Sequence, residues 1–195
     1  MHIVTFEEAA ELLAQGAVGV IPTDTVYGLV TRAEDEAAVT RMYALKHREQ
    51  KPGTLIAANT DQLLALGVPQ DEINKVAKYW PSPLSAVLPI TKKDNPLTDE
   101  IKCEYLHQGI GTLAMRVVAD EDIRTLLERT GPLITSSANQ PGEPPATNIN
   151  EAMAYFGDGV DFYVDGGTIK DVLPSTIVRP TKDGVEVLRQ GSISL

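Results

Sequence analysis

The apolar residues of this 195-residue chain change repeatedly between helical and extended spacing. Residues 6–13 place their apolar side chains at helical spacing, and the run ends at Gly16. Thr5 and Glu8 lie where a capping box would begin this helix. The same reasoning predicts helices at 35–46, 61–66, 71–79, 121–129 and 150–156, the last capped by Asn148 or Asn150. Extended segments predict strands at 17–21, 26–30, 54–58, 85–90, 112–118, 133–136, 162–164, 176–179 and 185–188.

Strands that are separated in some places by helices and in others by short turns are typical of an α/β (α+β) protein. The pattern predicts a twisted sheet of mixed parallel and antiparallel strands with helices on its faces. The only candidate break, the Pro- and Gly-rich segment 141–145, is too short to divide domains. We therefore expect residues 1–195 to form a single domain.

Composition narrows the class of protein. Hydrophobic residues make up 43% of the chain, which is enough for one well-buried core. The single cysteine, Cys103, excludes an internal disulfide, and no apolar run approaches the roughly 20 residues of a membrane span. The first residues also lack the basic and apolar regions of a secretory signal. We expect a cytoplasmic protein with no membrane partner.

Charge is distributed unevenly along the chain. The net charge of −10 opposes a broad nucleic-acid-binding surface, because phosphate contacts need clustered Lys and Arg. Yet the stretch from Arg41 to Lys51 carries four basic residues, including Lys46 and Arg48, against one acid. A solvated helix face, or cations favoured by the dipole at a helix C-terminus, would also explain this cluster.

A second polar cluster, residues 135–139 (Thr-Ser-Ser-Ala-Asn), offers hydroxyls and an amide. Lys46 would supply a mobile point charge and Arg48 a fork for two phosphate oxygens, with Ser137 and Asn139 completing the contacts. Neither G-x-x-x-x-G-K-[ST] nor G-x-G-x-x-G occurs, so side chains would have to hold a nucleotide. The alternative for the second cluster is a turn with Asn139 in the left-handed conformation.

Residues 22–29 (PTDTVYGL) and 174–178 (PSTIV) complete a pattern that resembles the YrdC-like family over nearly the full chain. The resemblance implies a YrdC-like fold and the synthesis of L-threonylcarbamoyladenylate and pyrophosphate from L-threonine, bicarbonate and ATP. This reaction begins the t6A modification of tRNA, so downstream t6A transfer proteins are expected partners. Mg²⁺ is expected with ATP, with no protein metal site and no organic cofactor. The family's catalytic tetrad would be Lys46, Arg48, Ser137 and Asn139.

The resemblance also assigns residues to the two larger substrates. The threonine-binding set would be Thr25, Arg116, Thr135 and Ser175, in which Arg116 pairs with the carboxylate of the amino acid. The ATP-binding set would be Arg48, Thr112, Ser137, Pro145 and Arg189. Taken singly, each position has an ordinary explanation as a strand residue, a turn residue or a surface charge.

The chain departs from the family pattern after Arg48. Members often carry Asn-Pro-Leu and a downstream His that contacts threonine, whereas residues 49–55 read EQKPGTL. The difference leaves room for a YrdC-like paralogue that acts on another acceptor. A double-stranded RNA- or tRNA-binding module without turnover is a third hypothesis, which the net acidity and the 5% aromatic content oppose.

Overall fold

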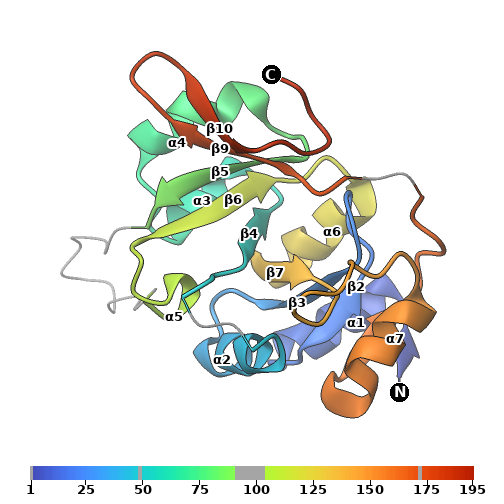
Figure 1. Cartoon of the computed structure of the whole chain (residues 1–195). Helices are drawn as coiled ribbons and strands as arrows, with labels where there is room; N and C mark the ends of the chain where they lie inside the picture. The colour runs from blue at the N-terminus through green and yellow to red at the C-terminus, as the bar shows by residue number, and fades with distance from the viewer. Residues whose placement is uncertain (1, 48–49, 91–103, 171–172) are drawn as a thin grey trace, which may run out of the picture.

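The computed structural model describes residues 2–47, 50–90, 104–170 and 173–195, so Arg48 and Cys103 lie outside the described residues. Its strands form one sheet in the order β1-β8-β2-β3-β7-β4-β6-β5-β9-β10 (Figure 1). The strands are β1 (Ile3–Val4), β2 (Gly19–Ile21), β3 (Gly28–Arg32), β4 (Thr54–Ala57), β5 (Leu84–Pro89), β6 (Thr112–Val117), β7 (Leu133–Ser137), β8 (Phe162–Val164), β9 (Thr176–Pro180) and β10 (Val185–Arg189). The helices are α1 (Phe6–Ala14), α2 (Glu36–Leu45), α3 (Thr60–Ala65), α4 (Gln70–Val76), α5 (Glu104–His107), α6 (Glu121–Thr130) and α7 (Ile149–Phe156), with 3-10 turns η1 (Ala77–Tyr79) and η2 (Gly157–Gly159).

Local chemistry sets the helix ends. The predicted capping box of α1 is confirmed: the Thr5 hydroxyl accepts from the Glu8 amide at 3.2 Å, and the Glu8 carboxylate accepts from the Thr5 amide at 2.8 Å. Gly16 follows the helix with a φ of +84°, a conformation that glycine adopts without strain. Asn148, the first of the two candidates, caps α7. None of the helices in the described ranges is both long and apolar enough to cross a bilayer.

The sheet is mixed, as the sequence predicts. β4 lies parallel to β6 and antiparallel to β7, and β3 pairs antiparallel with both β2 and β7. The sequence pattern misses β1 and α5, which have two and four residues and so carry almost no periodicity. β1 forms because it pairs in parallel with β8, a partner about 160 residues away along the chain.

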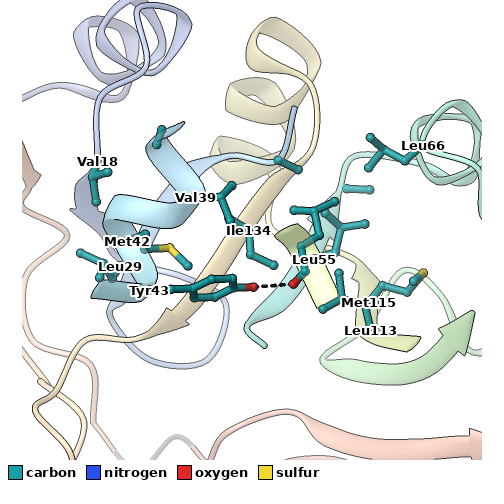
Figure 2. Packing of buried hydrophobic residues seen from close by; sticks show 14 of the residues in the cluster. Val18, Leu29, Val39, Met42, Tyr43, Leu55, Leu66, Leu113, Met115 and Ile134 are labelled. Atoms are coloured by element: carbon teal, nitrogen blue, oxygen red, sulfur yellow. Dashed lines mark hydrogen bonds between the residues drawn. The ribbon is translucent and has the colours of Figure 1, made fainter. Parts of the chain in front are cut away.

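Successive residues of the central strands pack into two different hydrophobic clusters, one on each face of the sheet. Leu55 belongs to the cluster beneath α2, α4 and α7, whereas Ile56 belongs to the cluster beneath α1 and α6. Figure 2 shows the first cluster, in which Met42 and Tyr43 of α2 lie over Ile134 and its neighbours. A slip of one residue would move each apolar set to the wrong face, so burial on both faces fixes the register.

The Tyr43 hydroxyl ties this cluster to the loop before β4. It donates to the Leu106 carbonyl at 2.7 Å and accepts from the Gly53 amide at 3.1 Å. Both contacts are buried, where a polar group without a partner would be costly. Tyr43 therefore holds α2, α5 and the start of β4 together beside the cavity described below.

Tyr163 predicts a pH dependence of stability. Its side chain is buried, its hydroxyl donates to the Gly157 carbonyl at 2.7 Å, and burial, aided by Asp158, raises its pKa to about 12. The unfolded chain loses this proton near pH 10, whereas the folded protein keeps it to a higher pH. The resulting contribution to the free energy of unfolding is therefore present below about pH 10 and is lost as the pH rises toward about 12. In urea titrations we expect the free energy of unfolding to fall over this window, and to fall less steeply in Tyr163→Phe. An identical slope in the two proteins would contradict the assignment.

Candidate active site

The register of four neighbouring strands brings polar residues onto one face of the sheet. Val30 of β3, Thr135 of β7, Thr54 of β4 and Ala114 of β6 lie side by side. Arg116 lies two residues beyond Ala114, so its side chain leaves the sheet on the same face. This is the face that α1 and α6 cover elsewhere with apolar contacts. The strands therefore present threonines and an arginine beside an otherwise apolar layer.

A cavity of about 320 Å³ opens over these residues. Its described lining includes seven predicted site residues, Thr25, Arg116, Thr135, Ser137, Pro145, Ser175 and Arg189. It also includes residues that were not predicted, among them Thr23, Gly28, Gly53, Thr54, Ser136 and Ile177. The structure thus brings together side chains that lie up to about 165 positions apart in the chain.

Arg116 is the most deeply buried charge in the cavity. Its side chain is 4% exposed, and one guanidinium nitrogen, Nη2, donates to Oδ1 of Asp24, whose side chain is 9% exposed. The same nitrogen lies 3.5 Å from the Thr25 hydroxyl. Burial raises the pKa of the Asp24 carboxyl and lowers the pKa of Arg116, and the attraction between the two charges opposes both shifts. The Arg116 guanidinium keeps its proton, as guanidinium groups do in proteins, and its contact through Nη2 favours the ionised form of the Asp24 carboxyl.

Ser175 and Arg189, which the resemblance assigns to different substrates, are in contact. Arg189 Nη2 donates to the Ser175 carbonyl at 2.7 Å, and the Ser175 hydroxyl lies 2.9 Å from that of Ser85. Burial lowers the pKa of Arg189. A Cβ added at Gly191 would lie 2.1 Å from the Pro174 carbonyl oxygen, so only glycine allows the chain after β10 to approach this closely.

Lys46 is not the mobile point charge that the sequence suggests. Its side chain is buried, and its Nζ donates to the Ser137 carbonyl at 2.8 Å, to the Asn139 Oδ1 at 2.9 Å and to the Asn139 carbonyl. Asn139 Oδ1 also accepts from the Ser137 hydroxyl at 2.6 Å. Lys46, Ser137 and Asn139 therefore form one hydrogen-bonded unit that joins the end of α2 to the end of β7.

The backbone of Asn139 excludes the alternative interpretation of residues 135–139 as a turn with Asn139 in the left-handed conformation. Asn139 does not have the left-handed backbone that the turn interpretation requires. Its Nδ2 donates to the carbonyls of Gln140 and Glu143, at 3.0 and 2.7 Å, and the Ala146 amide donates to the Ala138 carbonyl at 2.8 Å. These bonds shape the loop that carries Pro145 to the cavity.

Three members of the predicted site stand apart from the cavity lining. Lys46 and Asn139 lie behind Ser137, and Thr112 lies at the start of β6, paired with Pro89 of β5. Arg48 belongs to the residues that are not described, so its predicted role stays a prediction. Two polar residues that support the cavity, Asp24 and Ser85, were missed. Asp24 lies inside the PTDTVYGL motif, but nothing local in the sequence connects it to Arg116.

Metal ligands are scarce in the part of the chain that the structure describes. In these ranges no group of three or more His, Cys, Asp or Glu side chains is placed to hold a metal ion. The described cavity lining offers hydroxyls and guanidinium groups and no carboxylate. Such a lining suits an anionic ligand better than a metal ion held by the protein.

Comparison with known proteins places the chain in a family. The family model described as "Telomere recombination" (Sua5_yciO_yrdC) matches residues 11–191. A threonylcarbamoyl-AMP synthase of Idiomarina loihiensis is 34% identical over 93% of this chain and 96% of its own length. The crystal structure of Pyrococcus abyssi Sua5 complexed with L-threonine superposes with a TM-score of 0.82 and 28% identity, covering 98% of this chain and 58% of that one. This chain therefore spans little more than half of the archaeal protein.

A third comparison concerns the fold alone. The crystal structure of Escherichia coli YciO superposes with a TM-score of 0.78 at 24% identity, covering 97% of this chain and 94% of that one. The fold is thus an α/β domain with a mixed sheet that relatives share, and the chain belongs to the Sua5/YciO/YrdC family. The predicted resemblance is confirmed.

Proposed function

We propose that this protein is an L-threonylcarbamoyladenylate synthase, a nucleotidyltransferase that uses L-threonine, bicarbonate and ATP. The observation that carries the proposal is that Arg116, Thr25, Thr135 and Ser175 line the same cavity as Ser137, Pro145 and Arg189. The name of the Idiomarina relative and the threonine in the Pyrococcus complex support the same assignment. All four residues of the predicted threonine set and three of the predicted ATP set line this one cavity, which is the proximity that a reaction between the substrates requires.

Arg116 and the hydroxyls around it form the threonine end of the proposed site. A guanidinium can pair with the carboxylate of an amino acid, and Thr25, Thr135 and Ser175 can bond to its remaining polar groups. All four side chains are buried, so these contacts would form in a medium of low dielectric constant. The amine of threonine would then combine with bicarbonate, releasing water and forming a carbamate.

Arg189, Ser137 and Pro145 form the nucleotide end. An oxygen of the carbamate would attack the α-phosphorus of ATP, a bond to the bridging oxygen would break, and pyrophosphate would leave. Arg189 would balance the negative charge that grows on the phosphates. Lys46 would act indirectly. It holds the end of β7, to which Ser137 belongs, and adds a positive charge beside that residue. The expected role of Arg48 is to bind phosphate oxygens.

Mg²⁺ and the later partners complete the proposal. The described lining has no carboxylate to hold a metal ion, so Mg²⁺ would enter bound to the phosphates of ATP and neutralise part of their charge. The adenylate product would pass to downstream t6A transfer proteins and so to tRNA. The net charge of −10 favours brief contact with tRNA over a broad binding surface.

The test is product formation from ATP, threonine and bicarbonate, followed by mass spectrometry with each substrate omitted in turn. We expect a threonylcarbamoyl-adenylate mass that disappears with any omission. An adenylate formed only with another amine would identify the YrdC-like paralogue. RNA binding that weakens with salt, without any turnover, would identify the RNA-binding module.

Gly28 gives a prediction about the threonine end. A Cβ at this position would lie 2.6 Å from the Thr135 hydroxyl and 3.2 Å from the Thr23 Cγ2. Gly28→Ala should therefore displace the Thr135 hydroxyl and raise the KM for threonine about tenfold, while the KM for ATP changes less. Gly159→Ala is the matched control, because its new carbon meets only a flexible Leu45 carbon at 3.3 Å. Equal effects of Gly28→Ala on both substrates would count against this arrangement.

A further inference from the structure

The partner of Arg116 is a residue with no assigned role. Asp24 lies in the loop between β2 and β3, and its carboxylate contacts Arg116 through Oδ1 alone. Its second oxygen, Oδ2, and the Arg116 Nε are buried and have no hydrogen-bond partner among the residues that the structure describes. A buried ion pair with two unsatisfied polar atoms contributes little to stability, so its presence beside the cavity calls for another explanation.

The second arginine of the cavity, Arg189, has different hydrogen-bond partners from Arg116. Arg116 pairs with the Asp24 carboxylate, whereas Arg189 donates to the neutral Ser175 carbonyl at 2.7 Å. Within the described residues, one cavity guanidinium is thus neutralised by a carboxylate and the other is not. The two positive charges lie in one space that must receive a carboxylate and a polyphosphate.

A polyphosphate would compete for both arginines if they were equivalent. It carries several negative charges, and its attraction to a guanidinium exceeds that of a single carboxylate. A fixed negative charge beside Arg116 repels each ligand in proportion to the ligand's own charge. The penalty is therefore larger for a phosphate group than for the singly charged carboxylate of an amino acid.

We propose that Asp24 is a specificity-determining residue that reserves Arg116 for a monocarboxylate and directs polyphosphate to Arg189. This inference rests on the proposed function. Asp24 acts through Arg116, and the loop keeps it in place: the Thr23 hydroxyl accepts from the Thr25 and Val26 amides, both at 3.2 Å, and donates to the Val26 carbonyl at 2.6 Å. These hydrogen bonds fix the loop and hold the Asp24 carboxylate against the guanidinium.

The test uses Asp24→Asn, which keeps the shape and one acceptor oxygen but removes the charge. Inorganic pyrophosphate is the probe, and calorimetry measures its binding and that of L-threonine without turnover. In the wild type we expect pyrophosphate to compete with ATP and not with threonine. In Asp24→Asn pyrophosphate should bind about tenfold more tightly relative to threonine and should compete with it, and added salt should reduce this gain.

Asp161→Asn is the matched control, since Asp161 pairs with Arg41 at 2.6 Å and neither residue lines the cavity. It should leave both affinities unchanged. If Asp24→Asn folds poorly, Asp24→Ser tests the same loss of charge. Unchanged pyrophosphate binding in a folded Asp24 variant would overturn the inference. Absence of threonine binding by the wild type would instead overturn the proposed function, while the pyrophosphate comparison would still test Asp24.

Discussion

Lys46→Ala is expected to abolish adenylate formation and to lower the free energy of unfolding by about 3 kcal/mol. The substitution removes a buried ammonium that donates to the Ser137 carbonyl, the Asn139 carbonyl and the Asn139 Oδ1. Losing a charged donor while its acceptors stay buried costs more than losing a surface hydrogen bond. The end of β7 would then move, and Ser137 with it. Urea titration and the mass-spectrometric assay measure the two effects.

Lys75→Ala is the control for this result. Lys75 is 45% exposed and pairs with Glu72 at 2.6 Å on the surface of α4. Its removal should change stability by less than about 1 kcal/mol and leave turnover intact. Lys46→Met, which retains the length of the side chain, separates packing from charge. Full turnover in Lys46→Met would show that the ammonium has no part in the reaction.

Arg116→Ala is expected to have the second large effect, a loss of threonine use with a much smaller change in the KM for ATP. The cavity would lose the guanidinium that the proposed function assigns to the substrate carboxylate. The KM for threonine should rise about 100-fold or more, the usual cost of removing one partner of a buried charged pair. Arg129→Ala is the control, because Arg129 is 44% exposed and pairs with Glu7 at 3.3 Å on the surface. Equal losses for both substrates would contradict the assignment.

The same variant should show a distinctive pH dependence of stability. Without Arg116, the buried Asp24 loses the positive charge that opposes the rise in its pKa. A carboxyl whose pKa is higher in the folded than in the unfolded state stabilises the fold fully below its unfolded-state pKa of about 4. This stabilisation is lost as the pH rises through the folded-state pKa. Arg116→Ala should therefore be more destabilised at neutral than at acidic pH. Adding Asp24→Asn to it should remove this difference.

The sequence by itself determined the elements that have a local cause. The capping box at Thr5 and Glu8 and the helical spacing after it place α1, because these interactions join residues at most a few positions apart. The extended apolar segments likewise located the central strands, and their separation by helices in some places and by short turns in others predicted a mixed sheet. Elements too short to show a period, β1 and α5, were missed.

The candidate site divides in the same way. The motifs and the family resemblance named seven of the residues that line the cavity. Their roles followed from the resemblance to a family and not from the local physical chemistry of the sequence. Only the tertiary structure decided that Lys46 is buried against β7, that Thr54 lies beside Thr135, and that Asp24 neutralises Arg116. Each of these contacts joins residues more than 80 positions apart. Strand register and the desolvation of paired charges determine them, and neither leaves a periodic trace in the sequence.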